Sequence, residues 1–473
     1  MLNYIWLGLI VAAVLIGATN GSMEAVSKEA FDRVEFAVMK LALPLAGIMA
    51  LWLGVMRLAE RAGLIQILAH LLRPIMRRLF PDVPVQHPAM GSMLMNMAAN
   101  ILGLANAATP LGIRAMKDLE TLNPRPGLAT NAMCTFLAIN TSSIQLIPAT
   151  AVGVLAVNGS ANPSAIVGTA ILATICSTAA GIIAVKLLEK LPGYRLPPVQ
   201  PAAVRVMGAV EVGVSTEGTT EGILEPKAGS EPGQAGKIPP PAEGRTPAAM
   251  EIAPLNWFGI VALIGFGAFF LWAFVRVAFP GAFGIEVATG AARSHVFIRS
   301  VNAVSLLSIP FLLSFFPLYA ALRRVKVYEE FVEGAKEGFQ VSVMIIPYLV
   351  AIFVAIGMFR AAGGIEMLTS ALKPALDLVG FPTELLPMSL VRPLSGSGTL
   401  GLFTDLVKEF GADSLIARTG GTIFGSTETT FYVIAVYFGA VNVRRTRHAV
   451  PAGLIADAVG IIASVIICRM MFG

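Results

Sequence analysis

The stretch Ser414–Val441, SLIARTGGTIFGSTETTFYVIAVYFGAV, is apolar on both flanks and polar at its centre, and so is Gly127–Val157, GLATNAMCTFLAINTSSIQLIPATAVGVLAV. Each apolar arm has about 14 residues, whereas a helix needs about 20 to cross the hydrocarbon core of a bilayer. Non-helical backbone at that depth is tolerated only where protein or a water-filled cavity satisfies its polar groups. We therefore predict two re-entrant helical hairpins whose polar tips meet inside the protein.

The composition of the whole chain agrees with a membrane location. Of its 473 residues 56% are hydrophobic and only 13% are charged, against about 25% charged residues in soluble domains. The 34 Lys and Arg exceed the 29 Asp and Glu, but basic loops also set membrane orientation, so no nucleic-acid partner is expected. Three cysteines and four histidines show no disulfide, redox or metal-ligand spacing. We expect an all-α integral membrane protein without a metal site.

Nine further stretches are apolar over roughly the length that spans a bilayer. They are Met1–Thr19, Leu41–Glu60, Pro88–Gly112, Ser164–Leu188, Leu255–Phe279, Val296–Leu322, Val341–Arg360, Leu386–Leu406 and Ala449–Met471. The first lacks the positively charged start of a cleaved signal peptide and is predicted to stay as a helix. We therefore expect about nine transmembrane helices in addition to the two re-entrant hairpins.

The chain repeats itself on either side of a linker rich in Pro, Gly and Glu. Leu72–Pro74 (LRP) matches Leu372–Pro374 (LKP), and the polar centres of the two interrupted stretches align. Repeated units of this kind are a common way to build a transporter, and the linker composition predicts disorder. We expect a first repeat over 1–191, a disordered cytoplasmic linker over 192–254, an extra transmembrane helix and loop over 255–292, and a second repeat over 293–473.

Basic clusters predict how the repeats face. They occur at Arg73–Arg78, Lys186–Arg195, Arg323–Lys326 and Arg444–Arg447, and the two copies carry them at different positions. Because basic loops stay on the cytoplasmic side, the copies are expected to be inverted relative to each other. The N-terminus and linker are then cytoplasmic, and the C-terminus is outside.

Three ionisable residues, Arg392, Glu428 and Asp457, fall inside apolar stretches, where such groups are costly and mark function by default. Arg392 lies in a helix expected to break at Pro393; its guanidinium could hold an anionic or carbonyl-bearing group, or could lock the bundle by pairing with a carboxylate. Glu428 could coordinate a cation, accept a proton or bind substrate hydroxyls, unless its tip reaches the aqueous surface. Asp457 could pair with Arg392 or serve as a proton site.

Neutral polar residues complete the predicted site. Asn96 and Asn100 share one helix face and either line a cavity, bond a hairpin or allow close packing. The hydroxyls near Asn140 could read a substrate or only cap short helices. The candidate substrate-binding residues are Asn96, Asn100, Asn140, Thr141, Ser142, Ser143, Gln145, Arg392, Ser395, Ser397, Thr399, Thr427, Glu428 and Thr429, and the candidate coupling residues are Glu428 and Asp457.

Several long motifs resemble a known family. Met95–Gly112, Leu119–Pro124 and Asn140–Pro148 are similar to the spore maturation protein A family, whereas Arg392–Gly398 and Gly425–Tyr432 are similar to the spore maturation protein B family. The chain thus resembles a fusion of the two. This resemblance implies the nucleoside-recognition, or gate, superfamily, which includes concentrative nucleoside transporters and the membrane part of ferrous iron transporter B, and it implies the bacterial inner membrane.

The resemblance also implies roles for particular residues. Gly425–Glu428 is similar to the Gly-Gln-Thr-Glu hairpin tip of the nucleoside transporters, which places Thr427 and Glu428 in a binding role by resemblance. Asn140–Ile144 is similar to the Asn-x-Ser-Ser of their other hairpin region. Ser426 replaces the Gln, and the two tips occur in reversed chain order, so the resemblance does not carry over nucleoside specificity.

Together these features favour a secondary-active transporter of a small polar solute, coupled to Na⁺ or H⁺ and needing no other cofactor. The site is expected between two hairpin tips and two broken helices. A non-transporting scaffold in the cell envelope or in spore maturation, and a nucleoside transporter proper, are the alternatives. An enzyme is not expected, because no nucleophile–base pair or phosphate-binding loop is visible. The expected partners are the lipid bilayer and the solute, and the sequence leaves a homo-oligomer open.

Overall fold

The computed structural model describes residues 2–142, 145–196, 254–283, 296–367, 370, 373–374 and 380–473. Over these residues the chain is helical and contains no β-sheet, only an isolated bridge between Leu128 and Arg445. The expected all-α class is therefore confirmed. Ser143 and most of the predicted linker over 192–254 lie outside the described residues.

The first half of the chain forms nine α-helices among its described residues, with a π-helix between the second and the third. They are α1 (Leu2–Asn20), α2 (Met23–Glu35), the π-helix η1 (Phe36–Ala42), α3 (Leu43–Arg61), α4 (Leu64–Leu79), α5 (Pro88–Leu102), α6 (Ala105–Glu120), α7 (Asn131–Thr141), α8 (Ala149–Val157) and α9 (Ile166–Leu188). Segments α2, η1 and α3 run on without a break, as one apolar helix over Met23–Arg61.

The second half has a similar order of described elements. Its described helices are α10 (Trp257–Ala278), α11 (Val296–Leu322), α12 (Val327–Ala361), α14 (Leu386–Val391), α15 (Gly396–Phe410), α16 (Leu415–Ser426), α17 (Thr430–Gly439) and α18 (Ala449–Phe472). In this order α12 takes the place of α2–η1–α3, the pair α14–α15 that of α5–α6, the pair α16–α17 that of α7–α8, and α18 that of α9. Helix α10 packs mainly on α11.

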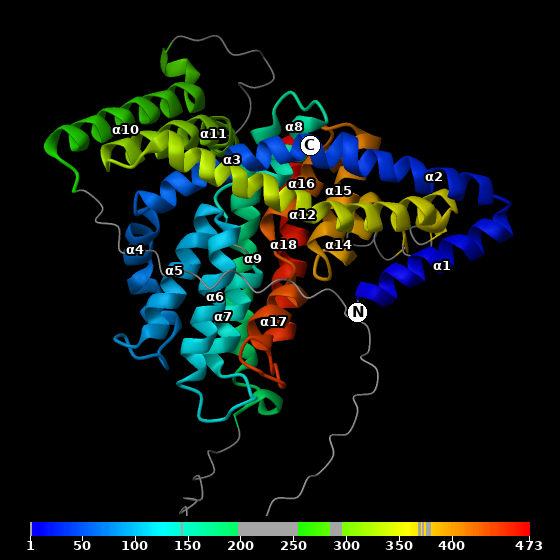
Figure 1. Cartoon of the computed structure of the whole chain (residues 1–473), viewed down its shortest axis with the longest axis horizontal. Helices are drawn as coiled ribbons and strands as arrows, with labels where there is room; N and C mark the ends of the chain where they lie inside the picture. Colours follow the sequence, from blue (N-terminus) through cyan, green and yellow to red (C-terminus); the bar gives the residue numbers. More distant parts are fainter. Residues whose placement is uncertain are drawn as a thin grey trace, which may run out of the picture. The chain divides into compact units, whose positions relative to one another are not determined.

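Corresponding long helices run antiparallel. Ser177 of α9 donates a hydrogen bond to the carbonyl of Ala456 in α18 (2.9 Å), and Arg447, just before α18, binds the carbonyl of Tyr194, just after α9. The end of α9 therefore lies at the start of α18. Helices α3 and α12 are also antiparallel, since Gly54 lies against Phe331 whereas Gly338 lies against Met49 and Ala50. Figure 1 shows them lying across α9 and α18.

The basic end is our name for the end of the bundle where α9 ends and α18 begins. The basic residues there are Arg125, Lys190, Arg195, Arg445 and Arg447. Backbone bonds gather these segments, since the amide of Ala129 donates to the carbonyl of Arg445 (3.1 Å) and that of Leu128 to the carbonyl of Arg125 (3.1 Å).

The prediction of re-entrant hairpins at Gly127–Val157 and Ser414–Val441 is wrong in one respect. Both stretches do break into two short helices at their polar centres, but each continues to the far end of the bundle. Helix α7 begins at the basic end, whereas α8 ends beside Asp413, which accepts hydrogen bonds from Ser160 (2.7 Å) and from the Ala161 amide (2.8 Å). The 23 residues of α9, at about 1.5 Å rise each, separate these two ends.

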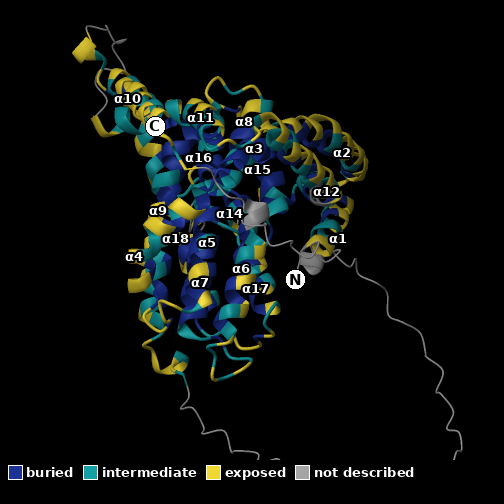
Figure 2. Ribbon diagram, turned by 60° about the vertical axis from the view of Figure 1, so that its left-hand side comes forward, coloured by how far each residue is buried: buried dark blue, intermediate teal, exposed yellow. Residues whose placement is uncertain are grey.

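Helices α16 and α17 make the same crossing in the opposite direction. Helix α16 begins beside Asp413 and α17 ends at the basic end, where the amide of Arg444 donates to the carbonyl of Gly127 (3.0 Å). Figures 1 and 2 show α8 and α16 at one end and α7 and α17 at the other. Two short helices on opposite sides of a break can together cross the bilayer once. The short length of each arm therefore does not distinguish a broken crossing from a hairpin.

The hairpins are instead formed by two stretches predicted to be full crossings, Pro88–Gly112 and Leu386–Leu406. Helix α6 returns along α5, so that Asn96 of α5 donates to the carbonyl of Ala108 (2.8 Å). The turn is made by Gly103 in the left-handed conformation (φ 76°), which glycine adopts without a steric penalty. Helices α14 and α15 form the matching hairpin, because the start of α14 and the end of α15 line one cavity.

Six described helices are long and apolar enough to span a membrane. They are Met23–Arg61, Pro163–Leu188, Trp257–Ala278, Val296–Leu322, Val327–Ala361 and Ala449–Phe472. Each contains most or all of one predicted span. Of the other three predicted spans, the first is a shorter apolar helix, Trp6–Asn20, and two are the hairpins.

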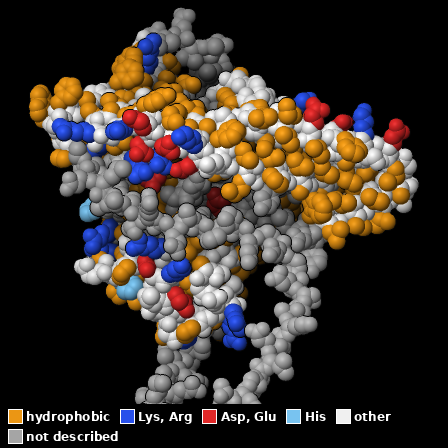
Figure 3. Space-filling view, in the orientation of Figure 1, with side chains coloured by type: hydrophobic (Ala, Val, Ile, Leu, Met, Phe, Trp, Pro, Cys, Tyr) orange, Lys and Arg blue, Asp and Glu red, His pale blue; other side chains and the backbone are white. Residues whose placement is uncertain are grey.

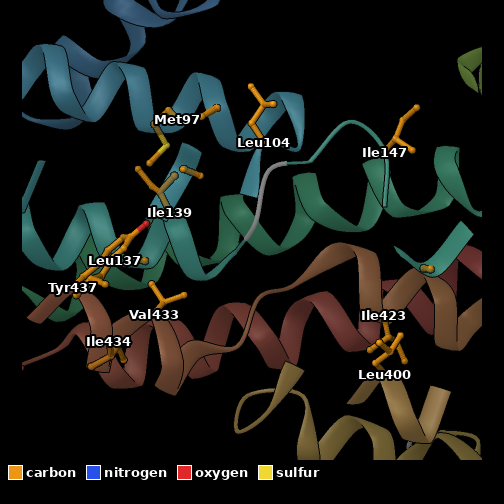
Figure 4. Packing of buried hydrophobic residues seen from close by; sticks show 14 of the residues in the cluster. Met97, Leu104, Leu137, Ile139, Ile147, Leu400, Ile423, Val433, Ile434 and Tyr437 are labelled. Carbon is orange, nitrogen blue, oxygen red and sulfur yellow. The ribbon is translucent and has the colours of Figure 1, made fainter. Parts of the chain in front are cut away.

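The core lies where the broken helices meet. In Figure 4, Leu137 of α7 lies against Tyr437 of α17, and Ile423 of α16 lies against Leu400 of α15 farther along the same core. The surface is apolar elsewhere: α10 is exposed over most of its length, and a broad hydrophobic area covers the part of the view in Figure 3 where α1, α2 and α12 lie. Such a surface suits contact with lipid.

Candidate functional site

Four interruptions of regular helix converge on one central cavity of about 220 Å³. They are the tip of hairpin α5–α6, the break between α7 and α8, the tip of hairpin α14–α15, and the break between α16 and α17. The long helices α3 and α12 cover it. Its lining is Met49, Trp52, Leu53, Gly103, Gln145, Ile147, Pro148, Ala149, Thr150, Val341, Arg392, Gly396, Phe424, Gly425 and Glu428.

The two helix breaks touch each other directly. The amide of Glu428 donates a hydrogen bond to the carbonyl of Thr141 (2.9 Å). A Cβ atom on Gly425 would lie 2.5 Å from the Cβ of Pro148, so only glycine permits this approach. The predicted meeting of the two polar centres is present, although neither centre is a hairpin tip.

Glu428 faces the central cavity and is partly buried. The side-chain amide of Gln145 donates to its Oε1 (3.4 Å), so the cavity joins an amide from the first copy to a carboxylate from the second. Of the candidate binding residues, Gln145, Arg392 and Glu428 line the cavity.

Arg392 is buried, with only 3% of its surface exposed. Its Nη2 donates to the carbonyls of Phe424 (2.9 Å) and Thr427, and its Nη1 to the hydroxyl of Thr429 (3.4 Å). The guanidinium also lies over the ring of Phe424, 4.9 Å from its centre. A cation is favourable at the carbonyl end of a helix, so Arg392 caps α16 and fixes the break, a lock made through backbone carbonyls.

Asp457 lies behind the break and outside the lining of the cavity. It is 1% exposed and accepts a hydrogen bond from the hydroxyl of Thr430, the first residue of α17 (2.6 Å). Its Oδ1 has no hydrogen-bond partner among the described residues. A buried carboxylate so placed connects α18 to the start of α17.

The three asparagines form a network that also lies outside the cavity lining. Asn100 donates to Asn140 (2.8 Å), and Asn96 donates to the hydroxyl of Tyr437 (3.3 Å), which in turn donates to Asn140 (3.4 Å). Sequence reasoning missed Tyr437, since a tyrosine in an apolar helix carries no distinctive pattern. Its position is evident only in the structure, where a Cβ on Gly112 would lie 2.2 Å from the Tyr437 hydroxyl.

The remaining candidate hydroxyls bond within their own segments. Thr141 and Ser142 donate to carbonyls one turn back in α7. Ser395 accepts from the amide of Gly398 (3.1 Å), which is the N-cap bond of α15. Thr399 donates to the carbonyl of Ser395 (2.6 Å), and Ser397 lies 3.4 Å from the Ser395 hydroxyl. This is the capping arrangement. Ser143 lies outside the described residues.

Thr427 and Thr429 belong to the break itself. Thr427 is buried, its hydroxyl donates to the carbonyl of Ile423 (3.3 Å) and its own carbonyl accepts from Arg392. Within the described ranges no three His, Cys, Asp or Glu side chains gather into a group that could hold a metal ion. The carboxylates of Glu428 and Asp457 are the site groups able to bind a proton or a monovalent cation.

Comparison with known proteins covers both halves. A family described as "Gate: Nucleoside recognition" matches residues 42–158. Spore maturation protein B of Bacillus subtilis (strain 168) is 44% identical over 173 residues, which are 37% of this chain and 97% of that protein. Spore maturation protein A of the same strain is 43% identical over 183 residues, 39% of this chain and 93% of that protein. No solved structure matches the chain.

Proposed function

The chain belongs to the family of spore maturation proteins A and B, and from this premise we propose that it is a secondary-active transporter of a small polar solute. The observation that carries the proposal is the central cavity, where four helix interruptions meet around Glu428 and Gln145. Broken helices near mid-bundle supply the freed backbone groups that transporter sites use.

The antiparallel relation of α9 to α18 and of α3 to α12 supports an inverted topology of the two copies. Hairpin α5–α6 then enters from the basic end and α14–α15 from the other, so each closes the cavity from its own side. We place the basic end in the cytoplasm, because basic segments are retained there. Alternating movement of the two hairpins would expose the cavity to one side at a time.

We assign coupling to two carboxylates, the partly buried Glu428 and the buried Asp457. Glu428 lies in the cavity, where a proton or Na⁺ bound to it would change the charge that a solute meets. Asp457 holds the hydroxyl of Thr430 at the start of α17, so an ion bound there would act on the break from behind. Intramembrane carboxylates commonly serve as such relays.

The proposal is tested by Glu428→Gln in proteoliposomes. Uptake of a panel of radiolabelled nucleosides, amino acids and carboxylic acids is measured with and without a proton or Na⁺ gradient. We expect the variant to fold but to lose gradient-driven uptake of the solute that the native chain carries. Glu35→Gln, at an exposed side chain outside the cavity lining, is the matched control and should transport normally.

A scaffold is the second candidate, favoured by one observation. The buried polar groups of the asparagine network and of Arg392 bond mainly to the protein itself. In a scaffold these bonds only interlock the two copies. Full uptake by Glu428→Gln would contradict the transport role of that carboxylate, and absence of uptake by the native chain across the panel would favour the scaffold.

A further inference from the structure

We propose that Arg33 and Asp405 form an ionic latch that holds hairpin α14–α15 against the long helices and so restricts access to the central cavity. The inference rests on the proposed function in so far as the cavity is the transport site. It assigns to two residues outside that cavity the control of access to it.

The geometry of the pair is specific. Arg33 of α2 donates through Nη1 to Oδ1 of Asp405 in α15, and through Nε to Glu29 (2.5 Å). To reach α15 its side chain passes over Gly357 of α12, where a Cβ would lie 2.6 Å from the Arg33 Cγ. A glycine at this crossing is therefore required for the pair to form.

Burial makes the pair unlike a surface salt bridge. Arg33 is 7% and Asp405 is 2% exposed, and Oδ2 of Asp405 has no hydrogen-bond partner in the described part of the chain. The free energy needed to desolvate two charges can exceed the attraction between them when the pair is imperfect. Apolar residues of similar volume at the two positions would often stabilise the protein as well or better. An incompletely satisfied buried pair suits a contact that specifies one arrangement and can also be released.

Two further contacts lie on the same interface. Arg360 of α12 pairs with Glu409 of α15 (2.5 Å), and the Lys408 ammonium lies 4.4 Å from the centre of the Phe36 ring. Phe36 begins η1, directly after α2. A π-helical turn interrupts the regular hydrogen-bond ladder and often marks a functional site. The long helix can thus bend next to Arg33.

Breaking the Arg33–Asp405 pair would affect the cavity by moving hairpin α14–α15. Helix α15 begins at Gly396, and the tip before it contains Arg392; both line the cavity. If α15 moves away from α2 and α12, Arg392 is withdrawn from the carbonyls of Phe424 and Thr427. The wall of the cavity on that side then opens.

The test measures access to the cavity and needs no knowledge of the solute. Thr150, which lines the cavity, is replaced by Cys in the full-length chain, after Cys176→Ser removes the exposed native thiol. The rate of reaction with a water-soluble maleimide is followed in detergent. We expect Asp405→Asn and Arg33→Gln each to raise this rate about tenfold, because loss of a buried charge partner shifts the population strongly. The double variant should add little to either single one, since both remove one contact.

Arg57→Gln is the matched control, because Arg57 pairs with Glu330 and Glu337 between α3 and α12 without touching the hairpin. It should leave the labelling rate unchanged. If Asp405→Asn does not fold, Arg360→Gln at the half-exposed edge of the same interface should still raise the rate about threefold. Unchanged labelling in a folded Asp405→Asn protein overturns the latch, even where transport is observed. Raised labelling without transport by the native chain supports the latch and contradicts the proposed function instead.

Discussion

The two helix breaks differ in how they are held. In the first copy the break after α7 is neutral, and its neighbours are linked by amides: Asn140 to Asn100, and Gln145 to Glu428. In the second copy the break after α16 carries charge, with Arg392 capping the helix and Asp457 bound to Thr430. Similar backbone arrangements are therefore held by amide side chains in the first half and by an arginine and a carboxylate in the second. The charged break has the stronger bonds and the larger penalty when a partner is lost.

The largest expected effect comes from removing the charge that caps α16. Arg392→Leu leaves the carbonyls of Phe424 and Thr427 buried without their donor, so we expect a loss of about 3 to 5 kcal/mol of stability. Thermal unfolding in detergent, followed by tryptophan fluorescence, measures it. Arg392→Lys keeps the charge but not the forked geometry and should recover only part of the stability. A wild-type melting curve for Arg392→Leu would show that the two breaks are held equally weakly.

A smaller effect is expected at the neutral break. Tyr437→Phe removes the hydroxyl that joins Asn96 to Asn140, and a buried amide that loses a partner costs about 1 to 2 kcal/mol. The same melting assay applies, with Tyr432→Phe as control because Tyr432 is exposed. A destabilisation as large as that of Arg392→Leu would remove the difference between the copies.

The smallest effect is expected where the copies join at the end opposite the basic end. Hydrogen bonds from the Ala161 amide and the Ser160 hydroxyl lower the pKa of Asp413 below its ordinary value of 3.8. A carboxyl group whose pKa is lowered on folding stabilises the protein fully above its ordinary pKa, and this contribution is lost as the pH falls below that value. The melting temperature should therefore drop slightly between pH 6 and pH 3.

Asp413→Asn isolates this contribution from other acid effects. The variant should melt slightly below the native chain at pH 6, and the gap should narrow as the pH falls to 3. At the basic end the corresponding joint is made by backbone bonds of Ala129 and Arg444, which do not titrate. A gap between variant and native protein that is the same at both pH values would show that the Asp413 carboxylate contributes nothing through its charge.

The sequence predicted the components of the site better than their path. The polar centres at Asn140 and Glu428 were expected to meet, and they do, because buried polar backbone has to find partners. The assignment of hairpins and crossings was reversed, since Gly127–Val157 and Ser414–Val441 cross the bundle and Pro88–Gly112 and Leu386–Leu406 turn back. An apolar run interrupted by polar residues has the same pattern in a hairpin and in a broken crossing, and only contacts such as that of Asp413 with Ser160 distinguish them.

Other features needed three-dimensional information altogether. Arg33 and Asp405 are 372 positions apart, and each alone resembles an ordinary charged residue of an amphipathic helix. Tyr437 acts through Asn96 and Asn140 of the first half, and Gly112 of that half leaves room for its ring. Residues that act in pairs across the two copies leave no local pattern, whereas caps such as Ser395 could be anticipated from neighbouring positions.

The composition of the cavity walls has a consequence for assembly. Gly103 and Gln145 come from one half and Glu428 and Gly425 from the other, so a complete cavity exists only where the halves are present in equal numbers. Joining them in one polypeptide fixes that stoichiometry. It also makes their encounter intramolecular, with an effective concentration set by the length of the intervening segment and independent of how much protein the cell makes.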